Sequence, residues 1–308
     1  MREVELLILG GGPAGLTAAI YGARAHLNTL VIEKGVPGGQ AALSAEIENY
    51  PGFIRISGQK MGDLFKRQAV RCGAAFAMDE IVALRPGDGR HVVEGYDDEY
   101  RAPSVIIATG ASPARLGVPG EKELIGRGIS YCATCDGTFF NGKRVAVIGG
   151  GDSALDEALY LTRHVEKITV VHRRDKLRAV PILQERAFSH PKIDFVWNSV
   201  VRSINGNGKV ESLSLKDTVT EASRILEADG VFIYIGNYPN TAFLPDSIRT
   251  DNGYVMTDEV MATSVPGIFA AGDVRKNQLK QIAVAVGEAA IAATSAVKYL
   301  EMVYQEST

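Results

Sequence analysis

Near its start the chain reads Leu6-Leu7-Ile8-Leu9-Gly10-Gly11-Gly12-Pro13-Ala14-Gly15. The four apolar residues predict a buried strand, and Gly10, Gly12 and Gly15 have the G-x-G-x-x-G spacing of a tight turn into a helix. Such a turn lets a pyrophosphate approach the backbone at the positive N-terminus of the helix. Glu33 follows about 20 residues later, after a second predicted strand, where a carboxylate can accept hydrogen bonds from ribose hydroxyls. The segment therefore favours a dinucleotide site over a glycine turn without a ligand.

The same pattern recurs in the middle of the chain. An apolar run at 145–148 precedes Gly149-Gly150-Gly151-Asp152-Ser153-Ala154, and a helical stretch to about residue 164 and a strand at 168–171 follow. Short β-branched runs that alternate with helix-length segments indicate βαβ units and parallel sheets. Each half also ends in an apolar strand that runs into glycine, at 105–108 and at 231–235.

A chain of 308 residues is long for a single core, so we expect two domains. The tail holds one more apolar strand at 268–271, then Gly272-Asp273 and a long helix from about Gln281, but no glycine-rich loop of its own. We therefore predict an α/β fold of two Rossmann-like dinucleotide-binding domains, with the second inserted into a discontinuous first. The first domain would comprise 1–114 and 242–308, and the inserted domain 115–241. Prolines within 112–119 and 237–241 mark the expected hinges.

Composition excludes several classes of protein. Hydrophobic residues make up 46% and charged residues 22% of the chain, and the formal net charge of −3 gives no indication of nucleic-acid binding. No uncharged apolar run approaches the roughly 18 residues of a membrane span, and the N-terminus has no secretory pattern. Three cysteines without an export signal predict a reducing compartment, so we expect a cytoplasmic protein.

The second glycine-rich loop differs from the first at two informative positions. Its third glycine is replaced by Ala154, and His172-Arg173-Arg174 stands where Glu33 stands in the first unit, with Arg178 one turn further on. A carboxylate repels a 2′-phosphate, whereas guanidinium groups bind it through charge-assisted hydrogen bonds. We therefore expect the first site to hold an adenine dinucleotide without that phosphate and the second to prefer NADPH over NADH. A solvated basic patch is the alternative.

Two cysteines, Cys132 and Cys135, stand two residues apart with Asp136 directly behind them. A structural zinc site needs four ligands, but Cys72 is the only other cysteine and no second pair of ligands has metal spacing. The compartment and the small loop disfavour a static structural disulfide. The pair therefore predicts a redox dithiol, beside which Asp136 could shuttle protons. We interpret Cys72 as a small buried apolar residue without a role.

The run Cys132-Ala133-Thr134-Cys135-Asp136-Gly137 resembles the active site of low-molecular-weight thioredoxin reductases of the bacterial and archaeal type, and the resemblance covers nearly the whole chain. The other matching segments are Gly38-Gly39-Gln40, Glu48-Asn49-Tyr50-Pro51-Gly52, the loop 149–154, His172-Arg173-Arg174 with Arg178, Pro239-Asn240-Thr241, Gly272-Asp273 and Gln281. The chain departs mildly from the family at Lys280, where arginine is frequent, and at Asn237-Tyr238, where His-Ser is frequent.

The resemblance implies a thioredoxin-disulfide reductase. Electrons would pass from NADPH through FAD and the Cys132–Cys135 disulfide to thioredoxin or a glutaredoxin-like protein. FAD would occupy the outer, discontinuous domain and NADPH the inserted one, in a homodimer whose domains rotate between half-reactions. Cys135 would face the flavin, Cys132 would attack the disulfide of the partner protein, and Asp136 would donate and accept the proton.

The resemblance and the two loops together assign two sets of cofactor-binding residues. The set for FAD is Gly10, Gly12, Pro13, Ala14, Gly15, Glu33, Gly39, Gln40, Asn49, Thr109, Gly110, Gly272, Asp273, Gln281, Ile282 and Ala283. The set for NADPH is Gly149, Gly151, Asp152, Ser153, Ala154, His172, Arg173, Arg174, Arg178, Ile235 and Gly236.

Four other functions compete with this interpretation. A flavin dithiol oxidase or a ferredoxin-driven reductase of the same fold would not need the arginines at 173, 174 and 178. The flavoprotein subunit of alkyl hydroperoxide reductase carries an N-terminal redox extension, whereas the first strand is expected here by Leu6. A nucleotide-sensing protein without turnover would release no thiol from a disulfide substrate in the presence of NADPH.

Overall fold

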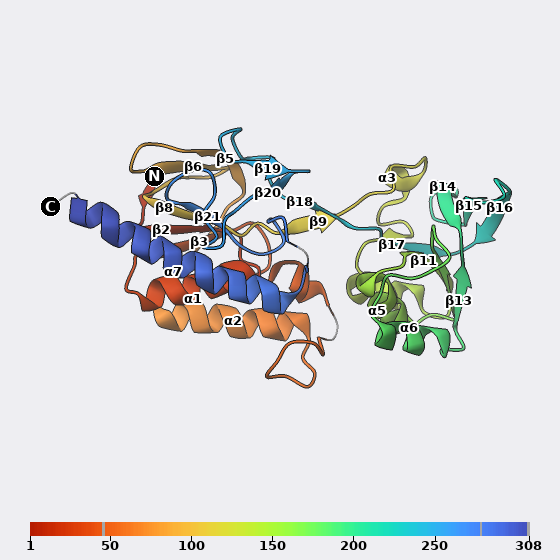
Figure 1. Ribbon diagram of the computed structural model, residues 1–308. Helices are drawn as coiled ribbons and strands as arrows, with labels where there is room; N and C mark the ends of the chain where they lie inside the picture. Colours follow the sequence, from red (N-terminus) through yellow and green to blue (C-terminus); the bar gives the residue numbers. More distant parts are fainter. Residues whose placement is uncertain (45–46, 278, 307–308) are drawn as a thin grey trace. The chain divides into compact units, whose positions relative to one another are not determined.

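The computed structural model describes residues 1–44, 47–277 and 279–306, and it divides into two compact units (Figure 1). Unit 1 comprises Met1–Ser112 and Tyr238–Thr308, and unit 2 comprises Pro113–Asn237. The two segments that link them, β9 (Ala111–Pro113) and β18 (Asn237–Pro239), pair as a two-stranded sheet. Unit 1 is therefore built from two stretches of chain and unit 2 from one.

Unit 1 is centred on a parallel five-stranded sheet. Its strands, in spatial order, are β21 (Ile268–Ala270), β8 (Ser104–Ile107), β2 (Leu6–Leu9), β3 (Thr29–Glu33) and β4 (Ala75–Met78). The central strand β2 is completely buried, because side chains that point to both faces of the sheet are covered. The short apolar run that opens the sequence thus forms the middle of the sheet, and the strand of the tail completes its edge.

Two layers cover this sheet. On one face, Leu6 and Ile8 share a core with the helices α1 (Pro13–Arg24) and α7 (Ile282–Glu306), and α2 (Gly58–Cys72) packs beside α1 (Figure 1). On the other face, Leu7 and Leu9 share a core with a four-stranded sheet. Its strands are β1 (Arg2–Glu3), β7 (Glu99–Ala102), β6 (His91–Gly95) and β5 (Ile81–Arg85). The short elements η1 (Gly39–Leu43), β19 (Thr250–Asp251) and β20 (Tyr254–Val255) complete the unit.

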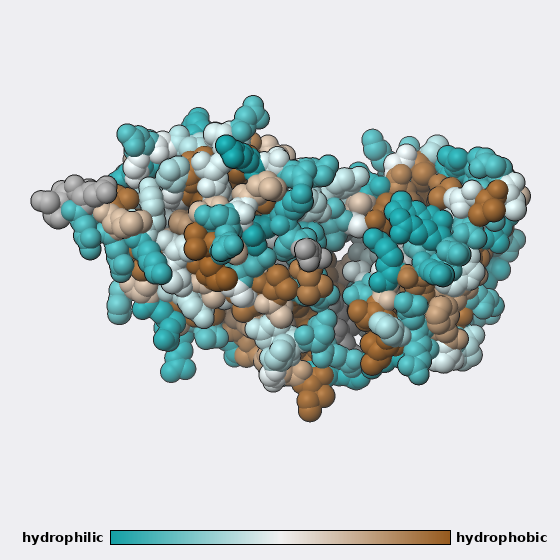
Figure 2. All heavy atoms as spheres, viewed as in Figure 1, coloured by the Kyte–Doolittle hydropathy of each residue, from teal (hydrophilic) through white to brown (hydrophobic). Residues whose placement is uncertain are grey.

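Helix α7 is long and apolar enough, by length and composition, to cross a membrane. In the structure its alanine-rich face, which includes Ala289, Ala292 and Ala296, packs into the core against α1. Small residues at this spacing allow two helices to approach closely, so packing within unit 1 explains the apolar residues on this face of α7. Ile291 and Met302 on the same helix are exposed, and Figure 2 shows both hydrophilic and hydrophobic residues on the surface in this view. Cys72, at the end of α2, is half-buried against the same core and has a free thiol.

Unit 2 repeats the arrangement on a smaller scale. Its parallel sheet has the spatial order β10 (Ile129–Ser130), β17 (Gly230–Tyr234), β11 (Arg144–Gly149), β12 (Lys167–Val171) and β13 (Ile193–Val196). The helices α5 (Asp152–Leu161) and α6 (Pro181–Phe188) cover one face. The antiparallel strands β14 (Ser199–Asn205), β15 (Ser212–Asp217) and β16 (Ser223–Glu227) cover the other. The short elements α3 (Glu121–Leu124), α4 (Ala133–Asp136) and η2 (Gly137–Phe140) lie on the chain before β11.

The predicted α/β class with parallel, Rossmann-like sheets is confirmed, because in each unit the central strand leads directly into the glycine-rich loop and a helix. Element ends differ slightly from the sequence prediction. Helix α5 ends at Leu161 rather than near residue 164, and strand β17 ends at Tyr234 rather than at 235. A turn at 162–164 replaces the last part of the expected helix.

Candidate functional site: a dithiol and two glycine-rich loops

The first loop has the backbone geometry that its glycines predict. Gly10 has a φ of +105°, which favours glycine, and a Cβ on Gly15 would lie 1.8 Å from the carbonyl oxygen of Gly10. Only glycine at position 15 therefore lets the helix approach the strand. By contrast, no atom lies within 4 Å of a Cβ built on Gly12. The loop is thus tightly packed toward the sheet and open at Gly12, where α1 begins with its positive end.

Glu33 braces this loop. Its carboxylate accepts hydrogen bonds from the backbone N–H of Gly11 at 2.6 Å and of Gly35 at 2.7 Å. The residue is half-buried at the end of β3, beside the loop. A carboxylate has about four acceptor positions, so it retains capacity for ribose hydroxyls. The sequence predicted only the ligand contact, and the brace on the loop becomes visible in the tertiary structure.

Two distant segments meet at the first loop. Gly38 donates its N–H to the carbonyl of Gly11 at 2.7 Å, and a Cβ on Gly39 would lie 3.1 Å from the Cα of Gly12. A Cβ on Gly272 would lie 3.0 Å from the Cβ of Ala14. The predicted residues 38–40 and 272–273 therefore lie beside the start of α1, although they are far apart in the sequence.

Two further predicted residues contact each other directly. The side-chain amide of Asn49 donates to Oε1 of Gln281 at 2.9 Å across a separation of 232 residues. Gln281 immediately precedes Ile282 and Ala283, the first residues of α7. The loop 47–56 and the start of α7 are thus joined by a pair of neutral amides with exposed edges, which can hydrogen-bond a polar ligand.

At the same end of the sheet, where β8 runs parallel to β2 and a Cβ on Gly10 would lie 3.0 Å from the Cα of Thr109, Thr109 and Gly110 are fixed by Asn240. The Thr109 hydroxyl donates to the carbonyl of Asn240 at 2.8 Å, and the Asn240 amide donates to the carbonyl of Thr109 at 2.8 Å. The N–H of Asn240 donates to Gly110 at 3.0 Å. The motif Pro239-Asn240-Thr241 therefore closes unit 1 where the chain re-enters it.

A buried ion pair that sequence reasoning missed supports Gly272. Glu288 on α7 accepts the N–H of Gly272 at 2.8 Å and pairs with the guanidinium of Arg275 at 2.5 Å, and both side chains are almost fully buried. Asp273 lies next to them, and burial raises its pKa, while Lys280 partly offsets the effect. The only sequence signal was one glutamate within an alanine-rich helix.

Lys280, the departure from the family pattern, is well anchored. Its ammonium group donates to the carbonyls of Asp273 at 2.9 Å and of Arg275 at 3.2 Å, and it lies 4.2 Å from the ring centre of Tyr254. Burial lowers its pKa, and the carboxylate of Asp273 acts in the opposite direction. Backbone carbonyls thus hold Lys280 beside the loop 272–275.

The second loop repeats the geometry of the first with one change. Gly149 has a φ of +151°, and a Cβ on it would lie 2.9 Å from the Cβ of Ala154, so the methyl group of Ala154 fits because Gly149 lacks one. Around Gly151 the nearest atom is Nη2 of Arg178 at 4.0 Å. Asp152 accepts the N–H of Val180 at 2.8 Å, which leaves Ser153 exposed at the start of α5. Ile235 and Gly236, also exposed, follow β17 at the same end of the sheet.

The basic residues beside this loop divide into two kinds. Arg173, Arg174 and Arg178 are exposed, and none of them forms an ion pair within the part of the chain that the structure describes. The N–H of Arg178 donates to the carbonyl of Gly150 at 2.6 Å, which fixes the arginine against the loop. His172 is buried, and burial lowers its pKa, as do the neighbouring arginines. The hydrogen bond between its ring and the carbonyl of Lys176 acts in the opposite direction on the pKa. A Cβ on Gly150 would lie 2.5 Å from the His172 ring, so the ring shapes the loop, and the arginines supply the exposed positive charge.

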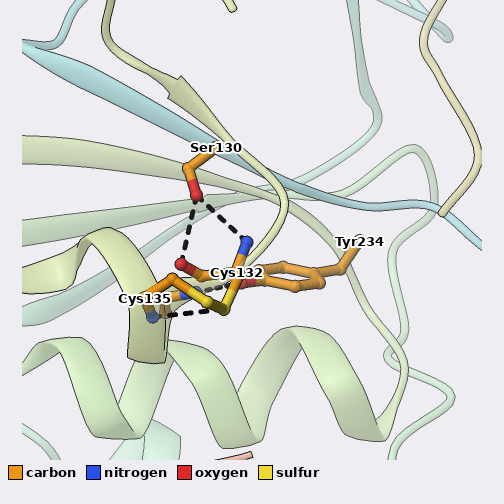
Figure 3. Close-up of a disulfide and its surroundings, with 5 residues drawn as sticks. Ser130, Cys132, Cys135 and Tyr234 are labelled. Atoms are coloured by element: carbon orange, nitrogen blue, oxygen red, sulfur yellow. Dashed lines mark hydrogen bonds between the residues drawn. A yellow bond between two sulfur atoms is a disulfide. The ribbon is translucent and has the colours of Figure 1, made fainter. Parts of the chain in front are cut away.

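The two cysteines form a disulfide in the loop before β11, with their Cα atoms 5.4 Å apart. Cys132 is half-buried at the N-cap of α4, and its sulfur accepts the N–H of Cys135 at 3.1 Å (Figure 3). Ser130 holds the same turn, because its hydroxyl accepts the N–H of Cys132 at 3.0 Å and donates to its carbonyl at 3.1 Å. Cys135 is exposed, and Asp136 follows it as the last residue of α4.

Tyr234 contacts this turn from the sheet. It lies at the end of β17, and its hydroxyl accepts the N–H of Ala133 at 2.9 Å (Figure 3). Among the described residues, no group of three or more His, Cys, Asp or Glu side chains could hold a metal ion. The dithiol, the second loop and the free arginines all belong to unit 2, and the first loop and its neighbours belong to unit 1.

Comparisons with known proteins agree with a disulfide and two nucleotide-binding loops in one chain. Residues 4–289 match the pyridine nucleotide-disulphide oxidoreductase family. A thioredoxin reductase from Listeria innocua is 51% identical over 96% of this chain and 94% of its own length, and one from Bacillus subtilis is 50% identical over 96% and 95%. The crystal structure of a thioredoxin reductase from Lactococcus lactis superimposes with a TM-score of 0.96 and 44% identity, over 97% of this chain and 99% of that one.

Proposed function

Because the chain belongs to the pyridine nucleotide-disulphide oxidoreductase family, and within it to the thioredoxin reductases, we propose that it carries electrons from NADPH through FAD to the Cys132–Cys135 disulfide and on to a thioredoxin or glutaredoxin-like protein. The observation that carries the proposal is the disulfide itself, which lies in a nucleotide-binding unit with one exposed cysteine. The proposal includes a homodimer in the cytoplasm, as the resemblance implies.

Unit 1 fits a flavin dinucleotide. The space at Gly12 would admit a pyrophosphate to the N-terminus of α1, and the Glu33 carboxylate lies where it can accept ribose hydroxyls. The loop at Gly272 lies beside Ala14 at this helix end, and the Asn49–Gln281 pair supplies further polar groups at the start of α7. No acidic side chain stands in the first turn of α1, so phosphates would meet no like charge there.

Unit 2 fits a pyridine nucleotide with a 2′-phosphate. The backbone around Gly151 is open, and the guanidinium group of Arg178 borders it. The side chains of Arg173 and Arg174 remain available for an anion, since they have no carboxylate partner in the described structure. We therefore propose NADPH as the electron donor.

Bound flavin and nicotinamide would together supply the two electrons that open the disulfide. The protein supplies the sulfurs, their protons and their placement. The N–H of Cys135 at the sulfur of Cys132 stabilises a thiolate there, which favours Cys132 as the nucleophile toward the partner protein. Cys135 would then receive the electrons and resolve the mixed disulfide, and Asp136 would handle the proton. Since the disulfide belongs to unit 2 and must meet both the flavin and a partner protein, the proposal includes a rotation of the units between half-reactions.

The greater exposure of Cys135 favours the opposite assignment, in which Cys135 attacks the partner. A trapping experiment separates the two. We expect Cys135→Ser to form a stable mixed disulfide with a thioredoxin that lacks its resolving cysteine and whose remaining cysteine carries thionitrobenzoate in disulfide linkage, with release of thionitrobenzoate as the leaving thiolate. Cys132→Ser should form none, and the reverse pattern would exchange the roles. Cys72→Ser, which changes the free cysteine, serves as the control.

The overall proposal is tested on the purified protein. We expect a flavin absorbance that NADPH bleaches anaerobically, and reduction of thioredoxin disulfide at the expense of NADPH. Serine in place of either Cys132 or Cys135 should abolish turnover while flavin reduction by NADPH persists. A colourless protein, or full turnover by the two serine variants, would refute the proposal.

A further inference from the structure

A carboxyl group that the proposed mechanism does not use lies on α5, the helix that packs against the dithiol turn. Oε2 of Glu157 is buried and forms no hydrogen bond with any described residue. The same is true of the hydroxyl oxygen of Thr134, one of the two residues between the cysteines. Two unsatisfied polar atoms in one place are costly, so they require an explanation. Here both lie at the redox-active turn, where α4 contacts α5.

The groups that surround the Glu157 carboxyl belong to the same turn and to the sheet behind it. The backbone amides of Ala133 and Thr134 and the hydroxyl of Tyr234 face it and favour its charged form. That hydroxyl also accepts the N–H of Ala133, and Figure 3 shows Tyr234 beside the dithiol turn. Glu157, Tyr234 and the turn therefore form one connected polar group. Because α4 contacts α5 and the carboxyl is buried, a change of charge on the sulfurs acts on the carboxyl through a poorly solvated region.

Burial dominates the electrostatics of this carboxyl. Burial raises the pKa of Glu157 to about 7, the neighbouring charge of Asp156 adds to the effect, and the groups just named partly offset it. Burial also raises the pKa of Tyr234, with contributions from Glu157 and Asp136. The other elements packed on α5, namely β11, β12 and α6, contribute apolar side chains such as Val147, Val170 and Leu183. No cation that would hold Glu157 ionised is among the groups acting on it.

From this arrangement we propose that Glu157 is a positioning residue for the dithiol, whose buried carboxyl takes up a proton when the disulfide is reduced and releases it when the disulfide re-forms. The inference rests on the proposed redox cycle of Cys132 and Cys135. Two electrons break the S–S bond and leave two sulfurs that carry negative charge to the extent that they are not protonated. That charge raises the proton affinity of the adjacent carboxylate, which takes its proton from water. Oxidation by the partner's disulfide removes the charge, and the proton returns to water.

Proton uptake linked to reduction has a measurable signature. Where Glu157 is already protonated in the oxidised protein, its replacement by glutamine changes little. Above its pKa the ionised carboxylate opposes reduction, so removing its charge favours the dithiol. If the reduced sulfurs raise the pKa of the carboxyl by about one unit, the dithiol–disulfide equilibrium constant changes about tenfold, or about 30 mV for a two-electron couple.

The experiment is a redox titration of the purified holoprotein without turnover. Buffers with a known ratio of reduced to oxidised dithiothreitol set the reduction potential, and maleimide labelling after acid quenching counts the thiols. The titration is repeated from about pH 5.5 to about pH 8.5. We expect Glu157→Gln to match the wild type at the acid end and to favour the dithiol about tenfold at the alkaline end. Glu166→Gln, which removes an exposed charge just beyond α5, is the control. The ratio of its dithiol–disulfide equilibrium constant to that of the wild type should not change with pH.

Tyr234→Phe provides a second test that leaves the carboxyl in place. Removing the hydroxyl raises the pKa of Glu157, so this variant should differ from the wild type only in a window around and just above pH 7 and agree with it at both ends. The inference would be overturned if the ratio of the Glu157→Gln equilibrium constant to that of the wild type did not depend on pH. If Glu157→Gln does not fold, the same outcome for Tyr234→Phe would overturn it. A Cys132–Cys135 pair that does not titrate at all would instead refute the proposed function.

Discussion

Changing both Arg173 and Arg174 to glutamine should weaken NADPH binding and leave NADH binding unchanged. Both side chains are exposed, and neither makes an ion pair within the described structure, so the change removes no native contact and should not lower stability. A hydrogen bond to a charged group contributes about 1.5–3 kcal/mol, and exposure to solvent and salt favours the lower end. At about 1.4 kcal/mol per factor of ten, each arginine accounts for about tenfold in affinity and the pair for up to about a hundredfold.

The assay is steady-state reduction of an aromatic disulfide or thioredoxin at varied NADPH and, separately, varied NADH. The KM for NADPH should rise while kcat changes little, because the arginines bind a group remote from the reacting atoms. The defect should shrink toward about 1 M salt, where screening weakens the wild-type contacts as well. Arg202→Gln, an exposed arginine on β14, serves as the matched control. An equal rise in KM for both nucleotides would refute the assignment of these residues to the 2′-phosphate.

Three further predictions concern stability and flavin retention. Gly15→Ala should lower both thermal stability and flavin content, because its Cβ would lie 1.8 Å from a backbone oxygen of the same loop. Gly12→Ala should lower flavin content alone, because its Cβ meets no atom within 4 Å. Equal melting temperatures of the two apoproteins would contradict this expectation. Asp79→Asn should cost about 1–3 kcal/mol in denaturant titrations near neutral pH. Burial opposes the charge of Asp79, but four hydrogen bonds to its carboxylate outweigh burial and lower its pKa. The difference in free energy of unfolding between wild type and variant should therefore shrink as the pH falls through that pKa, and a difference that stays the same in acid would refute the reasoning. Glu288→Gln should cost about 3–5 kcal/mol by leaving Arg275 buried without its partner, and a double change of the pair to apolar residues should cost less; additive losses would argue against coupling.

The sequence predicted the two nucleotide-binding units because their signals are local. A strand, three glycines and a helix occupy about a dozen consecutive positions, and steric rules act within that stretch: Gly10 needs its positive φ, and Gly15 has no room for a side chain. The dithiol was equally readable, since a spacing of two residues already places the sulfurs within bonding reach. The assignment of each unit to its cofactor remains a prediction for the experiments above.

The sequence could not indicate which distant groups would meet. Asn49 and Gln281 are 232 residues apart, and the glutamate that supports Gly272 comes from a helix that composition marks only as apolar. The sequence also did not show that His172 is buried, whereas Arg173 and Arg174 beside it are exposed. Burial depends on the whole fold, so no local pattern reveals it.

Local spacing by itself thus determined the two βαβ units, the glycine turns and the redox pair, because each is fixed by bond geometry over a few residues. Tertiary packing alone decided which side chains brace the loops and which carboxyl lies against the dithiol turn. Glu157 shows the difference most clearly, since its sequence position marks it as an ordinary surface residue of a helix. Burial of the carboxyl is what raises its proton affinity, and that burial exists only once α5 packs against the turn and the sheet.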